Sequence, residues 1–345
     1  MIQNAWFNKA KWVWLLLPLT LLFWCLSGLR RVFYALGLLK QSQGPLPLIV
    51  VGNISVGGNG KTPLTIALVE YLRSRGHRPA VLSRGYGGSQ SSFPHRVTPG
   101  NPASLVGDEP ALISQRLDCI VVIDPKRVRG CEYIAHTSDA DIIICDDGLQ
   151  HYAMARTVEL CVVDSRGLGN GYLLPMGPLR EGKWRLNTVD AIVFNQGFDA
   201  SISAPEAILS ATSPCFNMHL AANVWVNLKT KARINASEKD KIKSVLANKS
   251  LSAIAGIGDP QRFFNTIESL GISPQRLIPF ADHHAFSAQD LPNTDIVLMT
   301  EKDAVKCASF AHEGCWYLQI QANLPDAFFD SVIPQNLVAE KDSVL

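Results

Sequence analysis

A glycine-rich segment near the start of the chain has the residue types of a phosphate-binding loop. Glycines allow consecutive backbone N–H groups to curl around a phosphate chain, while lysine supplies a cation for the β- and γ-phosphates and threonine supplies a hydroxyl for Mg²⁺. Loops of this kind usually begin with glycine, and Ser55 replaces it here. The alternative is a turn that merely precedes Lys-Thr. We predict that this loop binds ATP, with Lys61 also catalytic and Thr62 also a metal ligand: Ser55, Val56, Gly57, Gly58, Asn59, Gly60, Lys61 and Thr62.

Two carboxylates, Asp146 and Asp147, follow the apolar run Ile142–Cys145. In open α/β sheets, ligands bind beyond the carboxyl ends of the strands. Carboxylates at that position can hold Mg²⁺ directly or through its waters. The competing interpretation is a polar turn that closes a strand. We predict that this pair contributes to the metal site, without distinguishing which of the two contacts the ion.

Strand and helix patterns alternate around these residues. Leu46–Val51 is a short apolar run typical of a buried parallel strand, and the residues after Thr62 present one apolar face up to Gly76, a credible helix cap. The alternation continues to the C-terminal part and predicts an α/β fold: a P-loop NTPase-like parallel sheet flanked by helices, with a second, smaller α/β domain. The predicted division is a membrane-associating segment over 1–40, a P-loop core over 41–200 and the smaller domain over 201–345.

The segment from Trp12 to Leu29 contains no charged residue and is barely long enough to cross a bilayer. A cleaved signal peptide lacks support, because Arg30 and Arg31 follow and no A-x-A site is present. A single span, a helix lying in the interface and a buried core helix remain. We favour the interfacial helix, since its tryptophans suit the headgroup region. Because ATP is cytosolic, residues from Lys40 onward must be cytoplasmic.

Composition narrows the classes of partner. The formal net charge of the 345 residues is +2, which gives no reason to expect nucleic acid. The eight cysteines form no C-x-x-C pair, which favours buried free thiols over zinc ligands.

Several motifs resemble those of one enzyme family. The stretch DDGLQH, from Asp146 to His151, resembles the signature of tetraacyldisaccharide 4′-kinases, and the glycine-rich loop is similar to the loop of that family, including the missing first glycine. The hydrophobic N-terminal helix also fits. Further similar stretches are SRGYGG at 83–88, GDEP at 107–110, LLPMGPLRE at 173–181, AGIGDPQRFF and ADHH.

The resemblance implies a specific reaction. Members transfer the γ-phosphate of ATP to the 4′-hydroxyl of the tetraacyldisaccharide 1-phosphate precursor of lipid A, giving lipid IVA. It implies ATP and Mg²⁺ as cofactors, the lipid A disaccharide precursor as partner and the cytoplasmic face of a bacterial inner membrane as location. No obligate protein partner is inferred.

The resemblance also assigns an acid–base pair. It makes Asp108 of GDEP the general base, although the residues alone favour a helix N-cap at Asp108. His283 is the implied partner, with the adjacent His284 as the alternative. For substrate contacts the candidates are Arg84, Arg180 and His151, since an arginine fork matches phosphate oxygens and His151 closes the DDGLQH turn.

Two other functions compete with the kinase. A membrane-associated P-loop ATPase switch has a similar loop, but its members often carry a lysine where this chain has Val56. A non-enzymatic membrane adaptor would leave Lys61, Thr62 and the two aspartates without a role.

Overall fold

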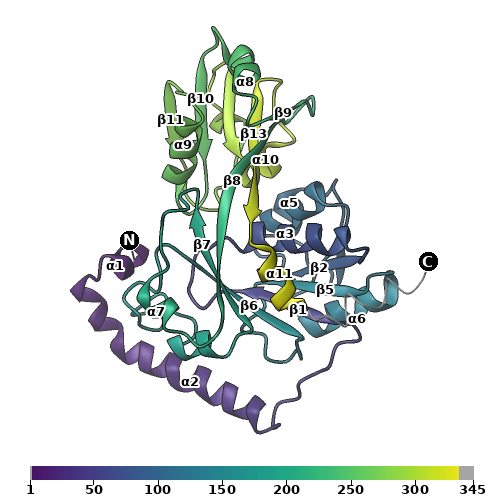
Figure 1. The fold of residues 1–345 in the computed structure, drawn as a ribbon, viewed down its shortest axis with the longest axis vertical. Helices are drawn as coiled ribbons and strands as arrows, with labels where there is room; N and C mark the ends of the chain where they lie inside the picture. Colours follow the sequence, from purple (N-terminus) through teal and green to yellow (C-terminus); the bar gives the residue numbers. More distant parts are fainter. Residues whose placement is uncertain (1, 334–345) are drawn as a thin grey trace. The chain divides into compact units, whose positions relative to one another are not determined.

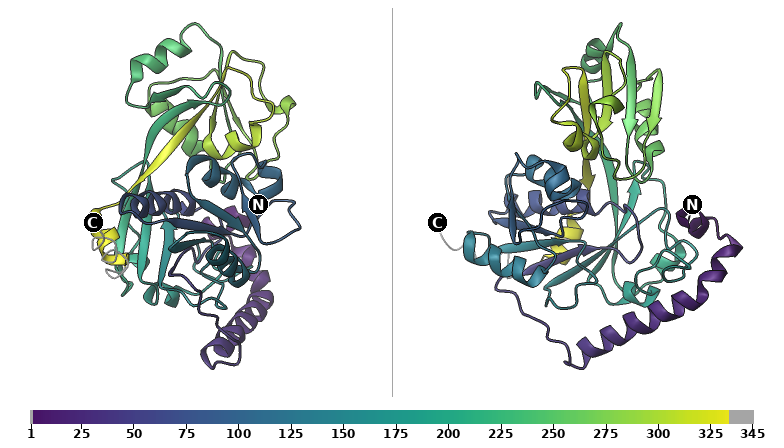
Figure 2. Two further views of the ribbon diagram at one scale, coloured as in Figure 1. Left: turned by 90° about the vertical axis from the view of Figure 1, so that its right-hand side faces the viewer. Right: turned by 180° about the vertical axis from the view of Figure 1, so that it is seen from behind.

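The computed structural model describes residues 2–333, which form two compact units (Figures 1 and 2). Each unit is assembled from separate stretches of the chain. Unit 1 takes the residues up to Arg84, Asp124–His219 and the residues from Asn323 on, and unit 2 takes Gly85–Ile123 and Leu220–Ala322. The predicted division at residue 200 differs from these units, chiefly because 85–123 belongs with the C-terminal strands.

Unit 1 is built on a parallel sheet with the strand order β8-β7-β6-β1-β5-β2. Strand β1 lies between β5 and β6, with Val51 opposite Asp146 on one side and Leu160 on the other. The strands of this sheet are β1 (Leu48–Gly52), β2 (Pro79–Ser83), β5 (Ile142–Asp146), β6 (Val158–Asp164), β7 (Ala191–Gly197) and the first part of β8 (Cys215–Asn227).

Continuous apolar runs make these strands buried on both faces. Every residue of β1 and of β5 is buried, as expected for parallel strands covered by helices. Helix α3 (Lys61–Ser74) packs against β1, β2 and β5, and α6 (Arg127–Thr137) packs against β2. The carboxyl ends of β1 and β5 thus reach the same edge of the sheet, where the glycine-rich loop and the two aspartates begin.

The N-terminal segment of unit 1 is helical and exposed. It comprises α1 (Ile2–Phe7), the 3₁₀ turn η1 (Lys11–Leu16) and α2 (Leu17–Ala35), and Lys11–Ala35 is apolar and long enough to cross a membrane. In α2 only Thr20 is buried. Figures 1 and 2 show α2 along the outside of unit 1. The remaining elements of unit 1 are η2 (Lys183–Asn187), α7 (Glu206–Leu209) and α11 (Asp326–Val332).

Unit 2 has its own parallel strands in the order β11-β10-β12-β13, with β13 followed by the second part of β8. Its core is a large apolar cluster around Trp225, Phe264 and Ile267. The elements are β9 (Arg233–Asn235), α8 (Lys239–Leu246), β10 (Leu251–Ala255), α9 (Pro260–Ser269), β11 (Arg276–Pro279), η3 (Ala288–Asp290), β12 (Ile296–Thr300), α10 (Glu301–Cys307) and β13 (Cys315–Asn323).

The stretch 85–123 completes unit 2. It contains β3 (His95–Val97) antiparallel to β4 (Ile120–Ile123), together with α4 (Ala103–Val106) and α5 (Asp108–Arg116). Helix α5 packs against α10, and Arg116 donates a hydrogen bond of 2.8 Å to Glu301 across that contact. The predicted α/β class, with a largely parallel sheet and an apolar N-terminal helix, is confirmed.

Candidate active site

The glycine-rich loop joins β1 to α3 in a conformation that only glycine adopts freely. Gly57 and Gly60 have φ of +115° and +98°, and Gly60 is the N-cap residue of α3. A Cβ on Gly60 would lie 2.3 Å from Nδ2 of Asn195, which donates to the Asn59 carbonyl oxygen at 3.0 Å. The loop therefore has the strand, glycines and helix start that an anion-binding loop requires.

A second segment supports the loop from the outside. The N–H of Val56 donates to the Pro178 carbonyl, and the N–H of Arg180 donates to the Ile54 carbonyl at 2.7 Å. Within the loop, Asn59 donates through Nδ2 to the Ser55 hydroxyl at 2.9 Å. The serine that replaces the usual first glycine is thus a hydrogen-bond acceptor that braces the loop.

Arg166 is a further support that the sequence did not reveal. Its Nη2 donates to the Gly58 carbonyl at 3.1 Å and to Oδ1 of Asn59 at 3.0 Å. Asp164, at the end of β6, fixes this guanidinium at 2.8 Å, and the ring of Phe7 lies 5.3 Å from it. A single arginine after a strand carries no sequence signal for this contact.

Lys61 and Asp147 meet at the start of α3. The Lys61 Nζ lies 3.6 Å from Oδ1 of Asp147 and donates to Oδ1 of Asn53 at 3.3 Å. Burial raises the pKa of Asp147, but Lys61 and Arg180 outweigh it and leave the pKa below its ordinary value. Asp147 is therefore an ionised carboxylate beside the loop lysine.

The two aspartates differ in accessibility. Asp146 ends β5 with only 1% of its surface exposed, and its carbonyl accepts a hydrogen bond from the buried Arg127. Asp147 adopts a φ of +51°, and its side chain is 35% exposed. Of the pair, Asp147 presents its oxygens outward. No group of three or more histidine, cysteine or acidic side chains is arranged to hold a metal within residues 2–333.

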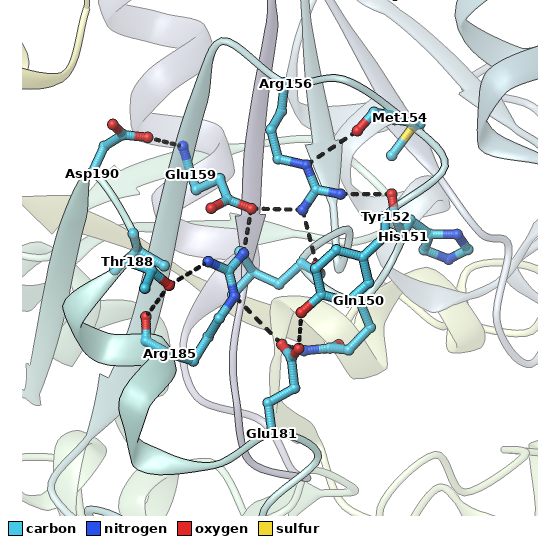
Figure 3. A network of polar contacts seen from close by, with 12 residues as sticks. Gln150, His151, Tyr152, Met154, Arg156, Glu159, Glu181, Arg185, Thr188 and Asp190 are labelled. Carbon is cyan, nitrogen blue, oxygen red and sulfur yellow. Dashed lines mark hydrogen bonds and ion pairs between the residues drawn. The ribbon is translucent and has the colours of Figure 1, made fainter. Parts of the chain in front are cut away.

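Arg180, predicted as a substrate contact, forms an ion pair with Asp147. Its Nη1 lies 2.9 Å from Oδ1 and 3.0 Å from Oδ2 of that carboxylate. The neighbouring Glu181 is buried and accepts hydrogen bonds from Gln150 and from the Tyr152 hydroxyl (Figure 3). Gln150 in turn donates to the Asn53 carbonyl at 3.1 Å. The DDGLQH turn and the LRE stretch thus form one polar network under the glycine-rich loop.

A second arginine holds the end of the same turn. Arg156 donates to the carbonyls of Leu149 and His151 and pairs with Glu159 at 2.6 Å (Figure 3). Desolvation, followed by the positive charges of Arg127, Arg84 and Arg30, lowers the pKa of His151 to about 4. His151 is therefore neutral near pH 7.

Arg84, another predicted substrate contact, is exposed just after the end of β2.

The predicted acid–base pair lies in unit 2. The Nδ1 of His283 is 3.0 Å from Oδ2 of Asp108, the first residue of α5. Gly107 occupies the N-cap position and no side-chain capping bond is present there, so Asp108 does not serve as the cap. Burial raises the pKa of Asp108, but the hydrogen bond with His283 and the charges of Lys306 and Lys302 lower it below the ordinary value.

The two adjacent histidines, His283 and His284, contact different residues. His283 has a φ of +59°, an uncommon conformation for a side-chain-bearing residue, and its ring meets the exposed Tyr86 edge-on at 5.8 Å. The Nε2 of His284 lies 3.4 Å from Asp290, and its ring packs against Phe280. Of the two, His283 is the one that contacts Asp108.

Most cysteines are buried, as expected from the sequence. Cys131, Cys145, Cys161, Cys307 and Cys315 are buried, and all eight cysteines are free thiols. Burial raises the pKa of Cys161 to about 12, so this thiol stays protonated and unreactive.

Comparison with known proteins identifies the family of this chain. The family model described as tetraacyldisaccharide-1-P 4′-kinase matches residues 12–337. A protein named tetraacyldisaccharide 4′-kinase from Aeromonas hydrophila is 44% identical over 96% of this chain and 95% of its own. One of the same name from Pseudoalteromonas atlantica is 46% identical over 90% of this chain and 96% of its own.

A solved structure supports the same family. LpxK from Aquifex aeolicus, crystallised in complex with ATP, has a TM-score of 0.79 and 26% identity, covering 95% of this chain and 98% of that one. The chain belongs to the tetraacyldisaccharide-1-P 4′-kinase family.

Proposed function

We propose that this protein transfers the γ-phosphate of ATP to the 4′-hydroxyl of the tetraacyldisaccharide 1-phosphate precursor of lipid A, giving lipid IVA and ADP. The observation that carries the proposal is the buried Lys61 at the start of α3, held beside the ionised Asp147 in a chain of this family. An ATP switch at the membrane would leave the Asp108–His283 pair without a role.

In this proposal, the backbone amides of the loop and the positive end of α3 bind the β- and γ-phosphates of ATP. Lys61 stabilises the charge that builds on the transferred phosphoryl group. Arg166 and Asn195 keep the loop carbonyls turned away from the phosphates, because both donate hydrogen bonds to those carbonyls.

The residues present fit Mg²⁺. Asp147 offers a partly exposed, ionised carboxylate and Thr62 a hydroxyl at the start of α3, both hard oxygen donors. Mg²⁺ commonly takes one or two protein ligands and completes its shell with phosphates and water, so a larger cluster is not required. The buried Asp146 would act on the ion only indirectly, through the waters around it. The ion would neutralise phosphate charge.

Asp108 is proposed as the base for the acceptor hydroxyl. Its Oδ2 faces His283, which leaves Oδ1 for the sugar 4′-hydroxyl. As the oxygen–phosphorus bond forms and the bond to ADP breaks, the hydroxyl proton passes to the Asp108 carboxylate. His283 keeps that carboxylate oriented. Arg84, His151 and Arg180 remain candidates for contacts with the substrate headgroup.

The N-terminal segment is proposed as a shallow anchor on the cytoplasmic face of the inner membrane. Its contacts with unit 1 recur along its length: Trp6 Nε1 donates to the Pro175 carbonyl, and Thr20 accepts from the Met176 N–H at 3.0 Å. Near its other end, the Arg31 guanidinium lies over the ring of Trp184 at 5.1 Å. A helix tied to one unit at both ends lies along it, which favours the interfacial arrangement over a span.

The outer surface of this segment suits acyl chains. Leu15 is 82% exposed and Leu26 is 60% exposed, far more than a core helix would allow. Other exposed apolar side chains are Trp12, Trp14, Leu19, Leu21, Leu22, Trp24, Leu29, Val32 and Phe33.

The test is an assay of the purified protein with Mg²⁺–ATP and the tetraacyldisaccharide 1-phosphate in mixed micelles. We expect a bisphosphorylated product, and we expect Lys61→Ala to abolish its formation. Lys229→Ala, an exposed lysine of unit 2, is the matched control and should retain activity. ATP binding without any phosphorylated lipid in the wild type would refute the proposal.

A further inference from the structure

A buried lysine stands between two aspartates behind the proposed base. The Nζ of Lys306 lies 2.9 Å from Oδ1 of Asp303 and 3.9 Å from Oδ2 of Asp108. Its side chain is only 8% exposed, and the ring of Phe286 lies 5.0 Å from Nζ. A cation so enclosed is held at a fixed distance from the Asp108 carboxylate.

Asp303 fixes this lysine from the inner side. It is fully buried, and its Oδ2 accepts hydrogen bonds from the Gly256 N–H at 2.9 Å and from the Thr300 hydroxyl at 2.7 Å. One carboxylate oxygen is therefore committed to the protein, and the other is left to Lys306.

The helices that carry Lys306 and Asp108 are also tied together. Arg116, at the end of α5, pairs with Glu301, the first residue of α10, and both side chains are nearly buried. Gln319 donates a further hydrogen bond of 3.0 Å to Glu301. The distance from Lys306 to Asp108 is thus set by the packing of α5 on α10.

We propose that Lys306 is a positioning residue for the reaction: acting through Asp108, it keeps the carboxylate ionised and holds Oδ2 toward His283, so that Oδ1 meets the acceptor hydroxyl. This inference rests on the proposed function. Lys306 touches neither substrate nor nucleotide in this role.

Lys302 has a different environment. Its Nζ lies 3.5 Å from Nε2 of His283, 3.7 Å from Asp282 and 4.0 Å from Glu109, and its side chain is 21% exposed. Asp108 is thus faced by His283, Lys306 and Lys302, but only Lys306 is both buried and directed at the carboxylate.

The experiment compares the pH dependence of kcat/KM for Lys306→Met, Lys306→Arg and the wild type from about pH 2.5 to 9, because the pKa of Asp108 in the wild type lies below 3.8. A cation within about 4–6 Å lowers the pKa of a carboxylate by roughly 1–3 units. Lys306→Met should therefore move the acidic limb upward by about one pH unit, and Lys306→Arg should restore it. Lys229→Met removes the same charge from an exposed position of unit 2 and should leave the acidic limb where it is in the wild type.

A second variant guards against misfolding. Lys306→Met leaves the charge of Asp303 buried and unpaired, which destabilises the protein. Asp303→Asn/Lys306→Met removes both charges and keeps an oxygen for Gly256, so it should fold. Its acidic limb should still move upward, but by less than in Lys306→Met, because the loss of the Asp303 charge acts in the opposite direction. An unmoved acidic limb in this folded double variant would overturn the inference.

A readout without turnover separates this inference from the proposed function. The ¹³C signal of the Asp108 carboxyl, assigned by its loss in Asp108→Asn, should titrate at higher pH in both methionine variants than in the wild type. The same titration midpoint in all of them would refute the role of Lys306. An active-site titration that shifts while no lipid is phosphorylated would refute only the proposed function.

Discussion

Arg180 holds Asp147 by both carboxylate oxygens, at 2.9 and 3.0 Å from the same guanidinium nitrogen. The carboxylate that we assign to Mg²⁺ is therefore shared between an arginine from a distant loop and the loop lysine, Lys61. Both cations thus pair with the Asp147 carboxylate, and we expect Arg180 to fix its orientation.

Arg180→Ala should accordingly lower kcat by roughly tenfold or more, as expected for loss of charge-assisted hydrogen bonds to a positioned group. The Mg²⁺ concentration needed for half-maximal rate should rise as well. Arg180→Lys keeps a cation on a shorter, differently shaped side chain and should recover only part of the rate. Unchanged Mg²⁺ dependence in Arg180→Ala would separate this arginine from the metal site.

The second prediction concerns Asp108. Asp108→Ala should lower turnover by roughly 10²-fold, the effect of losing a general base, while ATP affinity measured by calorimetry stays the same. Near-normal turnover in this variant would remove Asp108 from the mechanism.

The ionisation of Asp108 also predicts a pH dependence of stability. Its pKa is lowered from 3.8 in the folded protein, so its ionised form stabilises the fold above pH 3.8. That contribution is lost as the pH falls through the lower, folded pKa. The difference in unfolding free energy between wild type and Asp108→Asn should hold constant from pH 7 to 5 and shrink below pH 3.8. A difference that does not change with pH would contradict the assignment.

The third prediction concerns the support of the glycine-rich loop. Arg166→Ala removes two hydrogen bonds to the loop and should weaken ATP binding by roughly tenfold, about 1.4 kcal/mol. Phe7→Ala removes only the ring beside the guanidinium and should weaken ATP binding by a smaller factor. Isothermal titration with a non-hydrolysable ATP analogue measures both, and equal affinity for all three proteins would show that the loop needs no such support.

The fourth prediction follows from His151. Its pKa falls from 6.5 to about 4 in the fold, so the folded state favours the neutral ring. Below pH 6.5 the unfolded chain takes up a proton that the folded protein does not, and stability falls as the pH drops from 6.5 toward 4. His151→Gln should show a smaller drop in melting temperature between pH 7 and 5 than the wild type, in metal-free buffer. An identical drop would exclude this cause.

The fifth prediction concerns the membrane. Replacing the exposed Leu22 and Leu26 by glutamate should reduce flotation with anionic phospholipid vesicles, because the apolar surface of α2 is lost. Ser244→Glu and Ala247→Glu, two exposed neutral positions of unit 2, form a matched control for the two added charges. Equal flotation of the two variants would show that α2 does not carry the binding.

Local patterns were sufficient to predict the elements that hold the nucleotide site. The glycine-rich loop, the strand before it and the Asp146–Asp147 pair are contiguous in sequence, and the structure brings Lys61 to Asp147 as expected. Periodic apolar residues also located α3, which ends close to Gly76, a residue with φ of +80°.

Contacts between distant parts of the chain could not be predicted in the same way. The contact between Arg166 and Gly58 depends on where β6 lies relative to β1, which no local pattern encodes. Asp108 looked most like a helix cap because helix propensity is local, whereas its histidine lies far along the chain. No local pattern singles out Lys306 either, because the carboxylate of Asp108 lies far from it along the chain.

Unit 2 is not continuous in sequence: Asp108 comes from Gly85–Ile123 and His283 from Leu220–Ala322. A truncation that begins after residue 200 would produce the histidine without its aspartate, and one that stops before 220 would do the reverse. Either truncation would therefore break the Asp108–His283 pair, and a deletion series could not show which part of the chain carries the function. Dissecting this protein calls for point substitutions in the intact chain.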